Sequence, residues 1–459
     1  MIQGIFIDEF YCKKTRVDLL NGPIFTSMVR FAIPVLLSSI FQQLYNTMDT
    51  IIVGNILGET SLAAVGAAMP VYDLLMGFAM GMGHGLSIVT ARSFGSGNQT
   101  LLKKSVAATI KIGTVIAIVK TVLTRFVLFP FLELMHTPGE IIHEAYSYVS
   151  FITQFSAVTL AYNLCSGALR AIGNSVMPLV FLIISSLINI VLDILFITQF
   201  QMGIRGAAAA TVIAQAVSVV LCLIYIVRKT PLLVPEKKHF ETDKPLYKEM
   251  IAQGLSMSFM SCFVSAGTAV LQSGINGLGY LVIAGHTAAR KLCMFCLMPF
   301  SAMNGSINTF VSQNYGAGKP DRIRRAMKYA YCYNALVTGI LMVVIYSFAP
   351  QMVSFISGSE EAVVLGNGSM YLRVVAPFYF VLGVINQTRS ALQAIGRKIL
   401  PILSSVIELV GKIIFAMIFI PIFHYQAVIW CEPIIWCFMA VELVFAFWTN
   451  PYIRGKNRS

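Results

Sequence analysis

Apolar runs of membrane-spanning length dominate the pattern of this chain. A helix that crosses the hydrocarbon core of a bilayer needs about 20 predominantly apolar residues, and a window of about 19 residues detects twelve such runs. Short polar connections separate them, and only residues 228–249 form a longer polar segment. The pattern predicts an all-α polytopic membrane protein with twelve transmembrane helices, near residues 28–52, 63–92, 106–130, 144–166, 177–199, 206–227, 250–274, 281–312, 329–349, 367–388, 399–421 and 426–449.

An internal repeat divides the predicted spans into two sets of six. Residues 163–178 (NLCSGALRAIGNSVMP) and 386–401 (NQTRSALQAIGRKILP) are identical at seven positions. Because six is an even number, the two halves have the same orientation across the membrane, as in parallel-repeat secondary transporters. We expect two six-helix bundles, at residues 28–227 and 250–449, joined by a cytoplasmic linker at residues 228–249. A cytoplasmic N-terminal segment (1–27) precedes them, and a cytoplasmic tail (450–459) follows.

Composition and charge fit a membrane protein and predict its orientation. Apolar residues make up 57% of the chain and charged residues only 12%, with a net charge of +13. The Lys and Arg residues fall in short clusters between apolar runs, a pattern typical of membrane topology and not of a nucleic-acid-binding surface. With both termini on one side of the membrane, 26 Lys and Arg residues lie on that side and six on the other. Both termini are therefore predicted to be cytoplasmic.

The chain carries no motif typical of catalysis or of ATP binding. The glycine turns FGSG at 94–97 and YGAG at 315–318 lack the GxxxxGK[ST] spacing of a phosphate loop, and we interpret them as helix C-caps. No HExxH motif and no paired nucleophile and base are present. We therefore expect no enzyme activity and no cofactor, and transport driven by an ion gradient or by the substrate's own gradient.

Ionisable residues within the predicted spans are the first candidates for function, because they are costly in hydrocarbon. Asp49 lies near the outer end of the first span, and Asn189 and Asp193 share one face of the fifth at a spacing of four residues. From a rise of 1.5 Å per residue, Asp193 lies about 22 Å from the inner end of its span, and Thr211 about 9 Å from the outer end of the sixth. The sequence predicts that these four residues share one outer layer of the first bundle.

The second bundle does not repeat these acids. At the repeat offset Asn189 aligns with Lys412, and Glu408 precedes Lys412 by four residues, so that the two can pair with each other. Asp193 has the alternative interpretation of a helix-packing acid satisfied by neighbouring hydroxyl groups. Asp73 is equally compatible with a second cavity acid and with a local packing partner.

Together these features resemble the multidrug and toxic compound extrusion (MATE) family from about residue 20 to residue 450. The resemblance implies two six-helix bundles around a central cavity and export of bulky organic cations in exchange for protons or sodium. For the branch similar to DinF and MepA it implies an ion site, for H+ or Na+, at Asp49, Asn189, Asp193 and Thr211. The features that carry the resemblance are Pro34, Gln42, Tyr45, Asn46 and Asp49, the two glycine turns, residues 168–173 with Pro178, and Asn189 with Asp193.

The same resemblance implies that the substrate cavity is lined by Gln42, Tyr45 and Asn163, together with Asp49 and Asp193. We expect cationic drugs as substrates, no nucleic-acid partner, and a functional monomer in a bacterial cell membrane. NorM-type members of the family use acids in the C-terminal bundle, but the seventh and tenth spans here offer none within the bilayer.

Antiport by competition is the mechanism that these residues suggest. Two close carboxylates resist ionising together, so we expect the Asp49 and Asp193 pair to hold a proton that a lipophilic cation from inside displaces. The alternative is a flippase or exporter of a lipid-linked or anionic metabolite. Such a protein would line its cavity with cationic residues, for which Arg290, Arg389 and Lys412 are the only candidates.

Overall fold

The computed structural model describes residues 15–57, 59–134 and 139–455. The predicted segments 1–27 and 450–459 therefore lie partly outside the described residues, and so does the side chain of Asp73. The described chain divides into two compact units. Unit 1 comprises residues 15–22 and 33–258, and unit 2 comprises residues 23–32 and 259–455.

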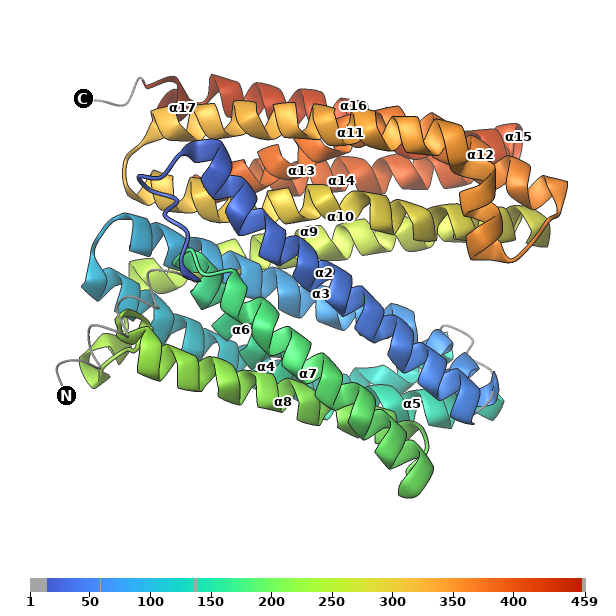
Figure 1. Cartoon of the computed structure of the whole chain (residues 1–459), viewed down its shortest axis with the longest axis horizontal. Helices are drawn as coiled ribbons and strands as arrows, with labels where there is room; N and C mark the ends of the chain where they lie inside the picture. The colour runs from blue at the N-terminus through green and yellow to red at the C-terminus, as the bar shows by residue number, and fades with distance from the viewer. Residues whose placement is uncertain (1–14, 58, 135–138, 456–459) are drawn as a thin grey trace. The chain divides into compact units, whose positions relative to one another are not determined.

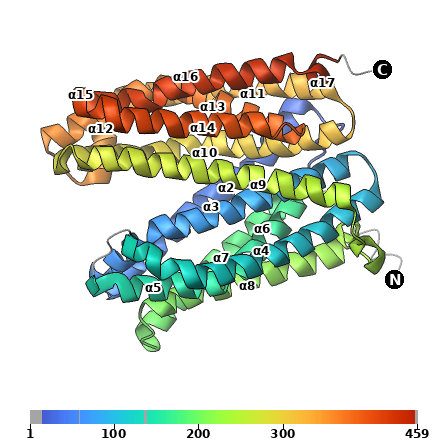
Figure 2. The same ribbon diagram turned by 180° about the vertical axis from the view of Figure 1, so that it is seen from behind.

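Unit 1 is built from long apolar helices. Helices α7 and α8 lie side by side in both views of the ribbon (Figure 1 and Figure 2), and α3 packs against α4, α5 and α6. The helices that contribute to unit 1 are α2 (Ile24–Leu57), α3 (Glu59–Gly95), α4 (Gln99–Leu134), α5 (Gly139–Gln154), α6 (Ser156–Ala171), α7 (Val176–Ile194), α8 (Ile204–Lys229) and the start of α9 (Lys244–Asn276).

Unit 2 repeats this plan. Helix α10 packs against α11, α12 and α13, and α14 packs against α16. The helices that follow α9 are α10 (Tyr280–Gly316), α11 (Pro320–Ser357), α12 (Ala362–Val375), α13 (Tyr379–Ala394), α14 (Ile399–Ile414), α15 (Ile420–Phe423), α16 (Tyr425–Thr449) and α17 (Pro451–Arg454). Each predicted span coincides with helical structure, and ten helical segments of the described chain are long and apolar enough to cross a membrane.

The two units share local irregularities at equivalent positions. A π-helical turn follows α7 at Leu195–Gln199, and another follows α14 at Phe415–Phe419. Gly173 after α6 and Gly396 after α13 have φ angles of 93° and 87°, a region in which side chains other than hydrogen are strained. The repeat seen in the sequence therefore extends to the backbone conformation of each unit.

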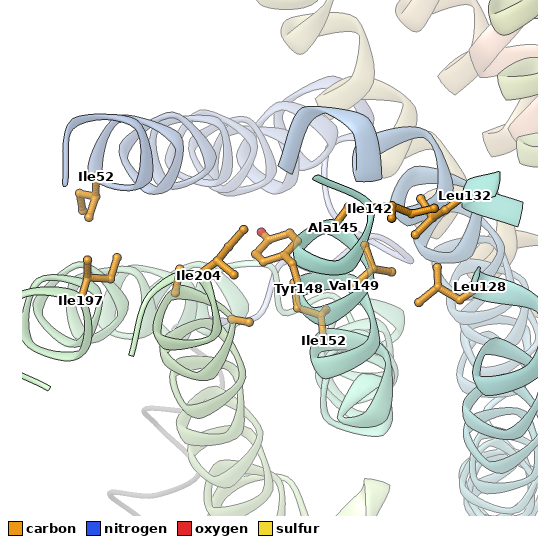
Figure 3. Close-up of a cluster of buried hydrophobic side chains, with 12 residues drawn as sticks. Ile52, Leu128, Leu132, Ile142, Ala145, Tyr148, Val149, Ile152, Ile197 and Ile204 are labelled. Carbon is orange, nitrogen blue, oxygen red and sulfur yellow. The ribbon is translucent and has the colours of Figure 1, made fainter. Parts of the chain in front are cut away.

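A cluster of buried apolar side chains packs one end of unit 1 (Figure 3). In Figure 3, Ile52 of α2 and Ile197 of the π-helical turn point toward each other. Side chains of α4, α5 and α8 complete this apolar cluster, which comprises Ile52, Leu128, Leu132, Ile142, Ala145, Tyr148, Val149, Ile152, Ile197, Ile204, Ala207 and Ala208.

Ion pairs hold the polar segment 228–249 of unit 1 against the start of α4. Lys103 Nζ lies 2.8 Å from Glu236 Oε1, and Lys104 Nζ lies 3.4 Å from Asp243 Oδ2. Hydrogen bonds from Lys103 and Lys238 lower the pKa of Glu236 to about 2. This carboxylate therefore stays ionised at acidic pH and keeps its contact with the start of α4.

Small residues allow α3 and the start of α9 to approach closely. A Cβ atom on Gly81 would lie 2.6 Å from the Ser258 Cα, and one on Gly85 would lie 2.5 Å from the Gly254 Cα. Both pairs are spaced by four residues, the small-xxx-small pattern that brings membrane helices together. Ser258 Oγ also donates a hydrogen bond of 2.8 Å to the Phe78 carbonyl.

We expect Gly85→Ala to destabilise the fold by about 1–3 kcal/mol, because the added methyl group overpacks this contact. Gly83→Ala is the matched control, since its Cβ would meet the Asn163 Cβ at an ordinary 3.6 Å. Thermal unfolding of the purified proteins in detergent measures the difference. Equal Tm values for the two variants would contradict the close contact.

Candidate functional site

The predicted acids Asp49 and Asp193 lie at the end of unit 1 that contains the apolar cluster of Figure 3. Asp193 on α7 and Asn189 one turn before it are both fully buried, and Asp49 on α2 is half-buried. Asp49 follows Tyr45 by one turn of α2 and Asp193 follows Asn189 by one turn of α7, and both Tyr45 and Asn189 bond to Thr211. Ile52 follows Asp49 by three residues and Ile197 follows Asp193 by four, so the apolar cluster of Figure 3 adjoins both acids.

Thr211 on α8 joins two other predicted site residues by hydrogen bonds. Tyr45 Oη donates to Thr211 Oγ1 at 3.1 Å, and Asn189 Nδ2 donates to the same oxygen at 3.4 Å. Helices α2, α7 and α8 thus each contribute one side chain to this polar contact. The structure brings together Tyr45, Asn189 and Thr211 on the helices that also carry the two acids.

Several buried oxygens at this site have no hydrogen-bond partner within the described part of the chain. They are both carboxylate oxygens of Asp193, Oδ1 of Asn189 and Oδ1 of Asp49. Buried polar groups are rarely left unpaired, because each one loses its hydration without compensation. These acceptors fit a proton or a small hard cation, and oxygen atoms of this kind are the preferred ligands of such cations.

Two of the predicted cavity-lining residues make other contacts. Gln42 is exposed and donates to Asn46 Oδ1 at 3.4 Å, and Asn163 on α6 donates to the Thr159 carbonyl at 3.0 Å. Thr159 in turn donates from its hydroxyl group to Gln215 Oε1 on α8. The sequence analysis missed Gln215, although its position one turn after Thr211 places both on the same face of the helix.

An apolar cavity of about 160 Å³ in unit 1 is separate from the acids. Its lining comes from α3, α4, α6, α8 and residues 233–235, and it includes neither Asp49 nor Asp193. Pockets that hold drug-sized molecules usually measure about 300–1,000 Å³. This cavity is therefore too small to enclose a bulky drug.

Unit 2 holds a network of buried ion pairs, most of which the sequence analysis did not find. The predicted pair of Lys412 Nζ and Glu408 Oε1 forms at 3.0 Å. Lys412 also lies 3.6 Å from Glu432 of α16, and Glu432 accepts a bond of 2.8 Å from Arg290 of α10. Arg389 lies 3.9 Å from Glu408 at the other end of the network. A signal for Glu432 was present, because it interrupts the apolar sequence AVIWCEPIIW.

The fold and these buried polar groups define a multi-pass helical membrane protein made of two similar bundles. A family model described as MatE matches residues 34–195 and 256–418, and the chain therefore belongs to this family of transporters. The family consists of transporters and not of enzymes, as the sequence predicted.

Curated relatives and a solved structure agree with this assignment. The chain is 26% identical to the "Probable multidrug resistance protein YoeA" of Bacillus subtilis over 84% of its length and 85% of that protein. It is 20% identical to the "Multidrug export protein MepA" of Staphylococcus saprophyticus, over 89% and 90%. It is also 24% identical to a "FAD transporter" of Shewanella oneidensis, over 86% and 87%.

The structure of a MOP superfamily transporter from Pyrococcus furiosus superposes with a TM-score of 0.87. The match covers 96% of this chain and 99% of that one at 24% sequence identity, so it is a match of folds. Together with the helices described above, it confirms the predicted all-α, twelve-helix membrane fold.

We expect Thr211→Ala to lower the free energy of unfolding by about 1–3 kcal/mol, because the buried amide of Asn189 and the half-buried hydroxyl group of Tyr45 lose an acceptor. Thr211→Ser keeps the hydroxyl group and is the matched control. Thermal unfolding of both variants beside the unaltered protein measures the effect. A Tm for Thr211→Ala as high as that for Thr211→Ser would show that the contact contributes little.

Proposed function

We propose that this protein is a secondary multidrug exporter that exchanges lipophilic organic cations for protons by alternating access. The fully buried carboxylate of Asp193, which has no hydrogen-bond partner among the described residues, is the observation that carries this proposal. A charged group in that position needs a proton, a metal cation or a cationic substrate to compensate it. Membership of a family whose relatives include multidrug resistance proteins supports the same conclusion.

In this proposal, the outward flux of the organic cation and the inward flux of protons are coupled because both bind to the same acids. With both carboxylates ionised, the acidic group of unit 1 attracts a cation, and apolar surface around it adds a favourable burial term. Protonation of one carboxylate removes that attraction and releases the cation. Because two neighbouring carboxylates resist ionising together, the first proton binds readily.

Sodium is the other coupling ion that the same oxygens could take. A sodium ion would be held by the carboxylates of Asp49 and Asp193 with the oxygens of Asn189 and Thr211, all of which are hard ligands. Proton coupling is preferred here because two neighbouring carboxylates resist ionising together, which favours a bound proton on one of them.

The remaining expectations belong to the same proposal. We propose a bacterial cell-membrane location with both termini in the cytoplasm, since Lys and Arg accumulate on that side. A functional monomer is proposed from the family resemblance.

A second candidate function is export of an anionic metabolite. The cationic side chains of unit 2, which include the buried Lys412, and the relative named as a FAD transporter favour it. Anion export would not depend on the acids of unit 1, so the two candidates differ in their response to the same substitutions.

We expect Asp193→Asn and Asp49→Asn each to reduce gradient-driven efflux of a cationic dye by at least about tenfold, equivalent to about 1.4 kcal/mol. Asn keeps the size of the side chain and removes its charge. Asp321→Asn, the same change at an exposed residue of unit 2, is the control. Efflux is measured in cells with matched expression, and unchanged efflux in both site variants would refute the assignment.

Imposed gradients in everted vesicles identify the coupling ion and its stoichiometry. We expect a proton gradient, and not a sodium gradient, to drive uptake of the dye. Exchange of one monovalent cation for one proton moves no net charge, so a membrane potential should then have no effect on its accumulation. Two protons per cation would add up to about 50-fold for each 100 mV.

A further inference from the structure

An open groove lies between α11 and α12 at one end of unit 2. The two helices pack side by side (Figure 1 and Figure 2). One part of the groove measures about 310 Å³ and is lined in part by Arg373, and an adjoining part measures about 420 Å³. Because Pro350 and Leu365 line both parts, the two form one continuous groove.

This α11–α12 groove lies where two predicted spans meet the membrane surface. Pro350 directly follows the predicted span 329–349, and Gly366 directly precedes the predicted span that begins at residue 367. Arg373 lies six residues beyond that beginning, about 9 Å along the helix. Since side chains on a helix tilt toward its N-terminus, a long arginine side chain at this depth reaches the level of the lipid headgroups.

Two polar side chains of the groove have no partner within the described part of the chain. Arg373 is exposed, and of this residue only the backbone carbonyl is bonded, by Tyr346 Oη at 3.0 Å. Ser369, one turn before Arg373, is only 5% exposed, and its Oγ has no hydrogen-bond partner. Buried hydroxyl groups are rarely left unpaired. A guanidinium group and a hydroxyl donor one turn apart are suited to a phosphate group, which guanidinium binds through two parallel hydrogen bonds.

An apolar stripe on α11 continues the groove toward the middle of the membrane. Leu336, Ile340 and Val343 lie on the same face of the helix as Pro350 and Ser354, because their spacings are three, four and seven residues. Their side chains are 62%, 57% and 70% exposed. A molecule that carries a phosphate group next to a long apolar chain can therefore contact the groove and the stripe together, whereas a free phosphate contacts the groove only.

The lining of the groove also favours one kind of headgroup. None of the described residues that line its two parts is acidic, so a cationic headgroup would find no counter-charge there. Gln351 and Ser354 line the wider part and offer uncharged donors and acceptors. These side chains fit a headgroup that carries hydroxyl groups, and the single charge of Arg373 balances one phosphate charge.

We propose that the α11–α12 groove binds an anionic phospholipid of the surrounding membrane. The phosphate group lies at Arg373 and Ser369, the hydroxyl-bearing headgroup occupies the wider part of the groove, and the acyl chains follow the apolar stripe of α11. In the proposed orientation this lipid belongs to the outer leaflet. The site includes no residue of the proposed ion site, so the inference is independent of the proposed function and is tested separately.

Native mass spectrometry of the purified full chain in detergent tests the charge of the site. Dioleoyl-phosphatidylglycerol and dioleoyl-phosphatidylcholine are added separately, and the dissociation constant of the first bound lipid is measured. We expect Arg373→Gln to weaken binding of phosphatidylglycerol about tenfold, because charge-assisted hydrogen bonds are lost. Arg125→Gln, the same change at an exposed arginine of unit 1, is the control and should leave the affinity unchanged.

A second pair of variants tests the groove without changing any charge. A Cβ atom on Gly366 would meet no other atom within 4 Å, so Gly366→Leu adds a side chain to the groove without a clash. We expect this variant also to bind phosphatidylglycerol about tenfold more weakly. Gly339→Leu is the matched control, since Gly339 on α11 is equally open and lies outside the groove. Equal Tm values without added lipid show that the variants are folded.

The outcomes separate the proposed lipid from other ligands. Unchanged binding of phosphatidylglycerol by either Arg373→Gln or Gly366→Leu would overturn the inference, and so would an equal loss in Arg125→Gln, which would indicate attraction to surface charge in general. Phosphatidylcholine bound as tightly, with the same dependence on Arg373, would contradict the anionic headgroup. Displacement of the lipid by an equal concentration of glycerol phosphate would assign the site to a soluble phosphate compound and contradict it as well.

Discussion

The cost of placing a charge within a membrane-spanning helix is the constraint on which the rest of this structure depends. In unit 2, Glu408 and Glu432 are each paired with a cation and almost fully buried, but both carboxylate oxygens of Glu442 on α16 have no hydrogen-bond partner among the described residues. In unit 1, the Asp193 carboxylate likewise has no hydrogen-bond partner among those residues. A buried carboxylate that the protein leaves unpaired is neutralised only when a proton or a cation binds to it, which is the basis of the proposed ion coupling.

The two units share one backbone architecture but carry different polar residues within it. The π-helical turns after α7 and α14 and the left-handed glycines after α6 and α13 occur at equivalent places. Helix α7 carries Asn189 and Asp193 before its π-helical turn, whereas α14 carries Glu408 and Lys412. The repeat therefore supplies a common scaffold, and the polar residues placed on it decide which acids find a partner within their own unit.

Much of the fold could be predicted because its signals are local. Apolar runs of about 20 residues specify spanning helices without reference to neighbours, and all twelve were found from the chain alone. The Glu408 and Lys412 pair was also predicted, since a spacing of four residues on one helix fixes their proximity. In contrast, Glu432 and Arg290 lie 142 residues apart, and no periodicity links them.

The sequence by itself determined the helices, their repeat and the presence of acids within the spans. Only the tertiary structure decided which polar groups meet: Tyr45 with Thr211, Thr159 with Gln215, and Arg290 with Glu432. It also decided that Arg290 is accessible while its carboxylate partner is buried. The physical reason is that spacing along one helix is fixed by its geometry, whereas contacts between helices depend on how side chains far apart in the chain pack together.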